Sequence, residues 1–332
     1  MDNKQNSKII KAIKVIKEEN SNNRRLKIID TPIDESLSPW EILIKIKAVG
    51  LNHRDLHAIQ NFSDFIIGSD ASGIVKKVGK CVSNFKVNDK VIINPVTNWN
   101  YPVSPPKEPN IIGGPSNGVF SEYVKINQKH VFLKPCHLSW EEAATLPLAG
   151  LTSYRNLFTK GRIEKNQMIL ITGISGGVSL LMAQMAKQLN CKVIGTSRND
   201  SQDLEYVDKI VNTNSNFKKT IGDSNIDLIL DNLGGALFSD YIEVIKPNGK
   251  IISFGNSMEE KINLSTRDLF YKQVNILGSS VGSKKEFIDM LSFVKNNNIT
   301  PFVEYIFELD KFLDAINLLK SKNYKGNIAI VL

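Results

Sequence analysis

Two histidines, His53 and His57, stand four residues apart in the segment GLNHRDLHAIQ, residues 50–60. On a helix, this spacing directs both imidazole rings to one side, where they can share a metal ion. A lone pair at this spacing also recurs by chance, so a metal site requires further ligands elsewhere in the chain. Whether the rest of the sequence offers such ligands is the first question.

A glycine-rich segment carries the clearest chemical pattern. Residues 168–199 read MILITGISGGVSLLMAQMAKQLNCKVIGTSRN, which predicts a strand, a turn that includes Gly176 and Gly177, a helix and a second strand. Glycines let the backbone approach a pyrophosphate, whose charge is held by amide N–H groups and the helix N-terminus. Ser179 stands where a third glycine is usual, and serine is small enough to keep the helix close to the strand. The segment predicts a dinucleotide-binding unit, with a structural turn as the alternative.

The end of the second strand distinguishes the two nicotinamide dinucleotides. An acidic residue there would hold the ribose 2′-hydroxyl of NAD and repel the 2′-phosphate of NADP. Ser197 and Arg198 occupy this place, and a guanidinium can bind a phosphate through two hydrogen bonds. Asp200 and Asp203 follow, and these are alternatively first-turn residues of the next helix. We therefore predict NADP(H), with NAD(H) as the alternative cofactor.

The length and composition of the chain limit the classes of protein to which it can belong. The 332 residues exceed what one hydrophobic core usually serves, and no apolar run approaches the roughly 18 residues of a membrane span. The net charge is +8, but lysines and arginines are spread along the chain without interleaved aromatics. This pattern predicts a basic, solvated surface with no nucleic-acid or membrane partner. The charged first twenty residues predict a cytoplasmic protein.

The elements that must position these residues fall into two kinds. Residues 9–133 alternate apolar and polar side chains, which predicts a β-rich domain. Within them, residues 94–118 hold six of the twelve prolines and predict an irregular loop. From residue 138 onward, helices alternate with short apolar strands, as in a parallel α/β sheet. Ser139 and Glu142 match a helix capping box at the start of this part.

Many segments occur together in the order of one known family. They are GLNHRDL, GSDASGIVKKVG, FKVNDKVIINP, GGPSNGVFSEYV, LSWEEAATLPLAGLTSYRNLF, TGISGGVS, DNLGG, KPNGKIISFG and NILGSSVGS. Over nearly its whole length the chain resembles the medium-chain dehydrogenase/reductase superfamily, and most closely its zinc-lacking, quinone oxidoreductase-like members. The resemblance implies an α/β fold: a GroES-like β-rich substrate domain, residues 1–137 and 276–332, and a Rossmann doubly wound parallel sheet, residues 138–275. It also implies a homodimer formed through the sheet edge near residues 274–281.

The resemblance bears on the histidine pair. Zinc-dependent members place a ligand cysteine and a ligand histidine where this chain has Asn52 and Ser69, and Leu148 falls near the third ligand. The loop at 94–118 replaces a lobe with four structural cysteines in those members, and it contains no cysteine. Hydroxyl and amide oxygens bind zinc poorly beside thiolate and imidazole. We therefore predict no metal. His57 matches a proton-relay position, so we expect it to contact ribose or substrate, with a structural role as the alternative.

The resemblance also implies cofactor-binding positions. They are Thr152 and Val178 near the nicotinamide, Ser175, Gly176 and Gly177 at the pyrophosphate, Asn232, Phe254 and Gly255 on the ribose side, and Gly278, Ser279 and Ser280 at the nicotinamide end. Residues 198–210 form a shorter segment than in relatives, which often carry there a lysine that contacts the 2′-phosphate. The terminal GKI of relatives reads Gly326, Asn327 and Ile328. Both departures favour the NAD(H) alternative.

The reaction follows from the missing zinc ligands. Oxidising an alcohol requires removal of a proton whose pKa, unassisted, is near that of water, about 15.7. Hydride addition to a quinone or an enone instead gives a delocalised oxyanion that hydrogen-bond donors stabilise. We expect the Asn52 amide to donate to this oxyanion and His57 or solvent to supply the proton. The alternative for Asn52 is that its amide only holds the loop.

We therefore expect a zinc-independent, NADPH-dependent oxidoreductase that acts on a small quinone or α,β-unsaturated carbonyl compound. Two other classes stay open. One is a zinc-free alcohol or aldehyde reductase of the same superfamily. The other is a non-catalytic nucleotide-binding protein that serves in sensing or assembly.

Overall fold

The computed structural model describes residues 8–18, 24–198, 204–222 and 225–332. The chain divides into two compact units. The first comprises Met1–Ala149 and Ser283–Leu332, and the second comprises Gly150–Gly282. Along the sequence, the second unit is therefore inserted into the first. These boundaries lie later than those expected from the sequence, at residues 137/138 and 275/276.

Helix α2 (Trp140–Tyr154) accounts for the first difference. The predicted capping box begins this helix: the Glu142 N–H donates to the Ser139 hydroxyl at 3.1 Å, and the Ser139 N–H donates to the Glu142 carboxylate at 2.6 Å. The following turns pack on the first unit, where a Cβ on Gly50 would lie 2.5 Å from the Ala144 carbonyl oxygen. At the second boundary, strand β14 (Asn275–Gly278) still belongs to the sheet of the second unit.

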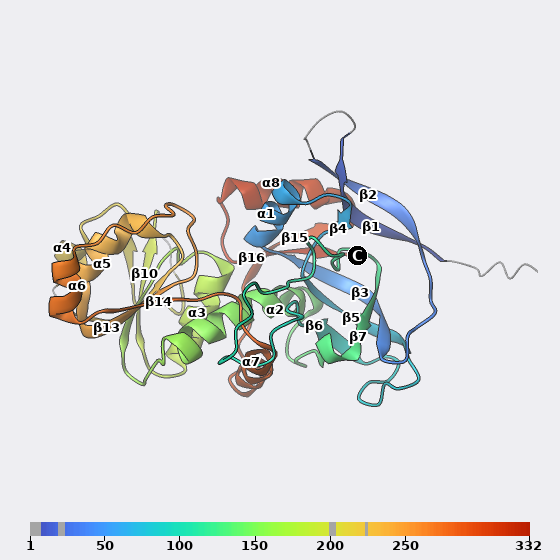
Figure 1. Cartoon of the computed structure of the whole chain (residues 1–332), viewed down its shortest axis with the longest axis horizontal. Helices are drawn as coiled ribbons and strands as arrows, with labels where there is room; N and C mark the ends of the chain where they lie inside the picture. The colour runs from blue at the N-terminus through green and yellow to red at the C-terminus, as the bar shows by residue number, and fades with distance from the viewer. Residues whose placement is uncertain (1–7, 19–23, 199–203, 223–224) are drawn as a thin grey trace, which may run out of the picture. The chain divides into compact units, whose positions relative to one another are not determined.

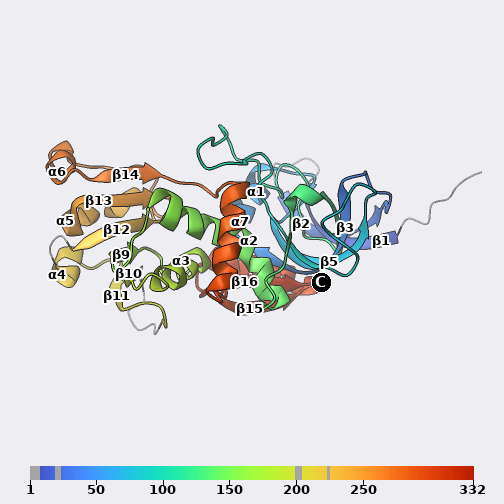
Figure 2. The ribbon, with the colours of Figure 1, turned by 90° about the horizontal axis from the view of Figure 1, so that it is seen from below.

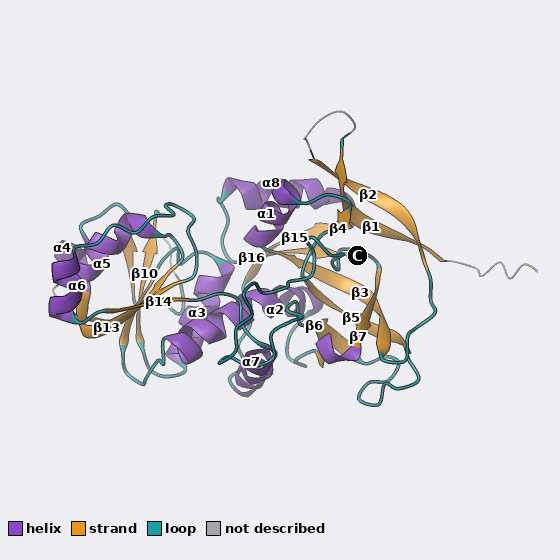
Figure 3. Ribbon diagram, viewed as in Figure 1, coloured by secondary structure: helices purple, strands orange, loops and turns teal. Residues whose placement is uncertain are grey.

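The first unit consists mainly of strands (Figure 3). A seven-stranded sheet has the order β15-β16-β3-β5-β6-β8, with β7 paired to β3, and a three-stranded sheet has the order β2-β1-β4. The strands are β1 (Lys8–Lys17), β2 (Arg24–Ile33), β3 (Glu41–Leu51), β4 (Phe65–Ile66), β5 (Asp70–Val78), β6 (Lys90–Ile93), β7 (Tyr123–Asn127), β8 (Val131–Leu133), β15 (Val303–Glu308) and β16 (Asn327–Val331). The helices are α1 (His53–Asn61), α7 (Lys284–Asn296) and α8 (Phe312–Ser321), with 3-10 turns at Gln128–His130 and Leu309–Lys311.

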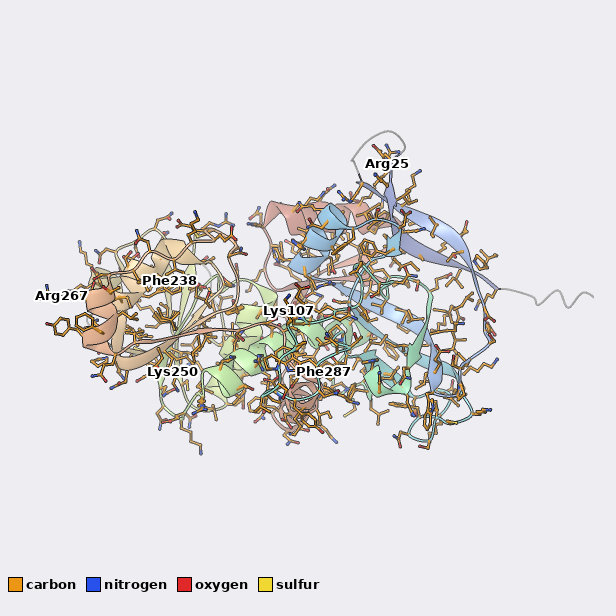
Figure 4. The ribbon with its side chains drawn as sticks, viewed as in Figure 1. Arg25, Lys107, Phe238, Lys250, Arg267 and Phe287 are labelled. Carbon is orange, nitrogen blue, oxygen red and sulfur yellow. The ribbon has the colours of Figure 1, made fainter. Side chains whose placement is uncertain are left out.

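Alternation of side chains explains the core of the first unit. Ile42, Ile44 and Ile46 of β3 point to one side and are buried in the main hydrophobic cluster, while Lys45 between them stays partly exposed. The last strand, β16, pairs antiparallel with β3, with Ile328 opposite Leu51. Phe287 of α7 packs on Phe132 with ring centroids 4.9 Å apart (Figure 4). The return of the chain therefore completes the sheet that residues 41–51 begin.

The second unit is built on a six-stranded parallel sheet with the order β11-β10-β9-β12-β13-β14. Its strands are β9 (Met168–Ile171), β10 (Lys192–Ser197), β11 (Lys209–Asn212), β12 (Ile226–Asp231), β13 (Ile245–Ser253) and β14. Its helices are α3 (Gly177–Lys187), α4 (Phe217–Ile221), α5 (Phe238–Val244) and α6 (Thr266–Lys272), with a π-helical turn at Arg155–Lys160 and a 3-10 turn at Gly235–Leu237.

The strand order is the doubly wound one of dinucleotide-binding sheets, which reverses direction between the first and fourth strands. Here that reversal lies between β9 and β12. Helix α3 covers one face of the sheet, and α4 and α5 lie on the other (Figures 1 and 2). The strands are apolar because both faces are covered, and Phe238 of α5 is fully buried against the sheet, whereas Arg267 of α6 is exposed (Figure 4). The expected α/β fold class is confirmed.

The proline-rich loop and the lengths of the helices can also be compared with the expectations from the sequence. Residues 94–118 form neither helix nor strand apart from a single bridge between Val96 and Ile111, as expected of a proline-rich loop. No helix in the described part of the chain has the length and apolar character that crossing a membrane requires.

The end of this loop is fixed by glycines that pack on Gly68, just before β5. Gly68 has φ +89°, and its carbonyl oxygen accepts the Val119 N–H at 3.0 Å. A Cβ on Gly113 would lie 2.4 Å from the same oxygen, and a Cβ on Gly68 would lie 1.8 Å from the Phe120 ring. Only glycine fits these positions, so the loop is held against the residues that lead into β5.

We predict that Gly68→Ala destabilises the protein by about 3 kcal/mol, because it adds left-handed backbone strain to a collision with Phe120. Urea unfolding followed by circular dichroism measures the loss. Gly278→Ala is the control, since an added Cβ there meets nothing within 4 Å. Equal midpoints for the two variants would contradict the predicted role of Gly68.

Candidate active site

The glycine-rich turn follows β9 as predicted and leads directly into α3. Gly173 has φ +54°, and the Gly176 N–H donates to its carbonyl oxygen at 3.0 Å, which closes the turn. Gly176 is the N-cap residue of α3 and lacks a side-chain cap hydrogen bond. The N–H groups of Gly177 and Val178 lie in the first turn of this helix. The N-cap residue offers them no side-chain acceptor.

This turn is locked by side chains at the point where the sheet order reverses. The Thr172 hydroxyl donates to the Asn232 side-chain oxygen at 3.0 Å and accepts the Asn232 N–H at 2.9 Å. The Ser179 hydroxyl donates to the Thr172 carbonyl oxygen at 2.9 Å and accepts from the Asn232 amide at 3.3 Å. Ser179 therefore bonds the helix to the turn at the position where a glycine was expected. The Asn232 side chain is used within this network.

The remaining cofactor positions of the second unit gather at one edge of the sheet. In a parallel sheet, the carboxyl ends of all strands lie at the same edge. Ser175, Gly176, Gly177 and Val178 follow β9, Ser197 and Arg198 end β10, Asn232 follows β12, Phe254 and Gly255 follow β13, and Gly278, Ser279 and Ser280 end β14. Neighbouring strands are bonded there as well: the Phe254 N–H donates to the Asp231 carbonyl oxygen and the Ser279 N–H to the Ser253 carbonyl oxygen, both at 2.9 Å.

Close packing brings Asn232 onto the turn and Gly255 onto Asn232. A Cβ on Gly173 would lie 3.0 Å from the Asn232 side-chain oxygen, and a Cβ on Gly255 would lie 2.8 Å from the Asn232 carbonyl oxygen. Thr152 of α2 is half-buried, and the hydroxyl of the next residue, Ser153, donates to the Val178 carbonyl oxygen at 2.9 Å. The predicted nicotinamide positions Thr152 and Val178 therefore come from adjacent elements.

The two residues expected to recognise a 2′-phosphate differ in exposure. Ser197 is buried at the end of β10, and its carbonyl oxygen accepts the Thr213 N–H at 2.8 Å. Arg198 is exposed immediately after the strand. Asp200 and Asp203 lie outside the described residues.

These residues fit a nicotinamide dinucleotide. A pyrophosphate requires backbone N–H groups at an open helix N-terminus, and the half-buried run from Ser175 to Val178 supplies them at the reversal point of the sheet. Arg198 supplies an exposed cation at the end of the adjacent strand.

The residues expected to do the chemistry lie in the first unit. Asn52 is the N-cap residue of α1, and its N–H donates to the Asp55 carboxylate at 2.8 Å. The Asn52 side-chain nitrogen lies 3.5 Å from the Gly50 carbonyl oxygen. His53 begins α1 and stacks on Tyr324, with ring centroids 6.2 Å apart, while His57 is exposed one turn later.

Two of the positions that correspond to zinc ligands, Ser69 and Leu148, hydrogen-bond to the buried carboxyl group of Asp70. The Ser69 hydroxyl donates to one oxygen of the Asp70 carboxylate and the Leu148 N–H donates to the other, each at 2.9 Å. Leu148 thus contributes only a backbone donor, which cannot bind a metal ion. The donor set does not fit a catalytic zinc.

Two buried carboxyl groups, Asp55 and Asp70, lie in this part of the first unit. The pKa of Asp70 is raised to about 7, mainly by burial and also by the charge of Asp55, while hydrogen bonds from the Leu148 N–H and the Ser69 hydroxyl oppose the rise. Burial likewise raises the pKa of Asp55 to about 6, opposed by Arg54 and the Asn52 N–H. In the described residues, no group of three or more His, Cys, Asp and Glu side chains is arranged to hold a metal ion.

Sequence reasoning missed two of these residues. Thr172 organises the cofactor turn, but a threonine at the end of a strand carries no signal of its own. Asp70 stands in GSDASG, between small residues at the start of an apolar strand, and such an acidic residue in a strand is itself a signal of a buried, bonded carboxyl group.

Comparison with known proteins agrees with both units. A family model described as an alcohol dehydrogenase GroES-like domain matches residues 38–136, and one described as a zinc-binding dehydrogenase matches residues 177–296. A zinc-type alcohol dehydrogenase-like protein of Schizosaccharomyces pombe is 30% identical, over 95% of this chain and 98% of the relative. An acryloyl-coenzyme A reductase of Sulfurisphaera tokodaii is 28% identical, over 87% of this chain and 92% of the relative.

Among solved structures, the quinone oxidoreductase from Coxiella burnetii superposes with a TM-score of 0.76 and 25% identity, over 98% of this chain and 100% of the other. The fold, the two matching family models and a relative that is 30% identical over nearly its full length agree with the motifs in the sequence. The chain therefore belongs to the medium-chain dehydrogenase/reductase superfamily and is an oxidoreductase.

Proposed function

We propose that the protein is a zinc-independent oxidoreductase that transfers hydride from NADPH to a quinone or an α,β-unsaturated carbonyl compound. The proposal rests on two features that occur in the same chain. The second unit has a glycine-rich turn at the point where the strand order reverses, and the first unit has Asn52, Ser69 and Leu148 at the positions of the zinc ligands. The second unit would bind the cofactor, and the first would bind the substrate.

The preference for NADPH is supported by the end of β10. Arg198 is exposed there, and no acidic residue precedes it on the strand to repel a 2′-phosphate. Ser197 is buried, so its side chain contributes less than the sequence alone indicates. NAD(H) is the alternative cofactor.

The choice of hydride acceptor is supported by the chemistry of the donor set. Without a Lewis acid, an alkoxide is hard to form, whereas hydride addition to a conjugated carbonyl spreads the charge over several atoms. Two of the relatives are, by name, an acryloyl-coenzyme A reductase and a quinone oxidoreductase. Both named substrates are conjugated acceptors, and the proposal extends that class to this chain.

Within the first unit, the proposed oxyanion donor is the Asn52 amide, whose contact with the Gly50 carbonyl oxygen is long, at 3.5 Å. A substrate oxyanion can replace so weak a contact. The exposed His57 imidazole or solvent would supply the proton that completes the reduction.

We also propose that the protein forms a homodimer through β14, an edge strand of the parallel sheet (Figure 2). The outer side of an edge strand offers backbone groups for pairing with another chain. Helix α6, just before it, has no buried residue and exposes Phe270 and Tyr271. A second copy would cover this apolar surface.

We predict that the purified protein retains no stoichiometric zinc after dialysis, because the amide and hydroxyl groups at the ligand positions bind zinc poorly. Elemental analysis measures the metal content. Retention of about one zinc per chain, with activity lost on chelation, would show that the histidines of α1 or other groups bind the metal.

NADPH should bind about tenfold more tightly than NADH, because one charge-assisted hydrogen bond contributes roughly 1.5–3 kcal/mol. Arg198→Ala should remove this difference by weakening NADPH and sparing NADH. Fluorescence titration of both cofactors measures the affinities, with the exposed Arg267→Ala as a control in the same unit. Equal affinities of the unmodified protein for the two cofactors would refute the NADPH preference.

The protein should reduce quinones or activated alkenes with NADPH and be almost inert toward ethanol with NADP+. Asn52→Ala should lower kcat roughly a hundredfold, the scale of losing one oxyanion donor, while the Kd of NADPH changes little. A screen of quinones, enones and aldehydes, followed by oxidation of NADPH, tests both points. Exclusive aldehyde turnover would favour an aldehyde reductase, and no turnover with tight NADPH binding would favour a sensor.

A further inference from the structure

Asp231, the last residue of β12, has a carboxylate that bonds to the turn after it and to helix α5. One carboxylate oxygen accepts the Tyr241 hydroxyl at 2.8 Å and the Leu233 N–H at 3.1 Å, and the other accepts the Gly234 N–H at 3.1 Å. Asp231 is fully buried. It therefore cannot contact a cofactor, and any effect on cofactor binding must act through its neighbours.

The two backbone bonds close a tight turn around Asn232. A carboxylate that accepts the N–H groups two and three residues further along the chain fixes the backbone in between, where Asn232 lies. The turn is also packed from outside: Gly234 has φ +92°, and a Cβ on it would lie 1.9 Å from the Glu259 carbonyl oxygen. The backbone of Asn232 is thus fixed by the residues on either side of it.

The Asn232 side chain connects this turn to the glycine-rich turn after β9. Its oxygen accepts the Thr172 hydroxyl at 3.0 Å, and its nitrogen donates to the Ser179 hydroxyl at 3.3 Å. Thr172 precedes the glycine-rich turn, and Ser179 follows it in the first turn of α3. A shift of the Asn232 backbone would therefore act on both ends of the turn that we propose to bind the pyrophosphate.

Tyr241 holds the Asp231 carboxylate from helix α5. The Tyr241 side chain is fully buried, and its ring centroid lies 6.3 Å from that of Phe217 and 5.3 Å from that of Phe238 (Figure 4). Close packing in such a cluster leaves the ring in one position, so its hydroxyl is fixed as well. A tyrosine hydroxyl in an apolar cluster needs a partner, and this one donates to Asp231. The carboxylate is therefore held by a rigid group while it holds the turn.

We propose that Asp231 is a positioning residue for the cofactor: its carboxylate, held by Tyr241, closes the turn that contains Asn232 and so keeps the amides of the glycine-rich turn in the arrangement that receives a pyrophosphate. The inference rests on the proposed function for the identity of the ligand, whereas the bonds from Asp231 to the turn do not depend on it. Both nicotinamide dinucleotides contain the pyrophosphate. Asp231 therefore affects the affinities for NADPH and NADH alike, unlike Arg198.

The binding test measures the Kd of both cofactors by fluorescence titration. Asp231→Asn keeps the size of the side chain but replaces one acceptor oxygen with a donor, so both Kd values should rise roughly tenfold. In the background of Asn232→Ala, the same change should alter them by no more than about twofold, because Asp231 acts through Asn232. Asp227→Asn is the matched control. Asp227 lies near the other end of β12 and bonds to the Met168 N–H and to Lys246, so its change should leave both Kd values unaltered.

The spectroscopic test needs no cofactor. In protein labelled with 15N at glycine, the amide signal of Gly176 is identified by its loss in Gly176→Ala, where the atom nearest to the added Cβ would be the Gly173 carbonyl oxygen, at 3.4 Å. Asp231→Asn should shift the Gly176 signal, because the hold on the glycine-rich turn is weakened. Asp227→Asn should leave it in place.

Unchanged Kd values or an unshifted Gly176 signal in Asp231→Asn would overturn the proposal, as would a fully additive loss of affinity in the double variant. If Asp231→Asn does not melt cooperatively, Tyr241→Phe replaces it, since this change removes one donor and keeps the carboxylate. Tyr241→Phe should weaken both cofactors about threefold, and unchanged affinities would again overturn the proposal. If the unmodified protein binds neither cofactor, the proposed function is wrong, and the Gly176 signal still decides whether Asp231 shapes the turn.

Discussion

A parallel sheet buried on both faces constrains everything that surrounds it. Its strands must run in the same direction, so every connection begins at one edge, and the side chains and amides that end the strands are collected there. In the second unit this single geometric fact brings Ser175, Arg198, Asn232, Gly255 and Gly278 to one edge, although they span more than a hundred residues of sequence. The order reversal between β9 and β12, beside the glycine turn, is the place where sheets of this strand order bind their ligands.

Because of this constraint, much of the second unit could be predicted from the sequence. The apolar strands, the glycine turn and the helix after it depend on local patterns, and all three are found where they were expected. The boundaries between the two units were harder to predict from the sequence. Helix α2 is continuous across one of them, and no local signal in its sequence indicates that its first turns pack on Gly50 rather than on the parallel sheet.

In the first unit, the residues of the candidate site could be predicted from the sequence, but their hydrogen-bond partners could not. Ser69 and Leu148 could be identified by their place in motifs, but their common partner Asp70 is recognised only when β5 and α2 are seen together. Such a partnership depends on tertiary contacts between residues far apart in the chain, and neither propensity nor periodicity reports them. The role of Ser179 is similar: its size was predictable, whereas its hydrogen bonds to Thr172 and Asn232 were not.

The pairing of β16 with β3 has a consequence for how the chain folds during synthesis. Strand β3 ends at residue 51, yet its partner spans residues 327–331, so the first unit cannot complete its main sheet until these later residues have left the ribosome. The second unit, residues 150–282, is contiguous and can fold earlier. Until β16 arrives, the edge of β3 near Ala48 and Leu51 carries unpaired backbone groups. That interval, rather than the finished protein, is when the chain is most exposed to aggregation through an open strand edge.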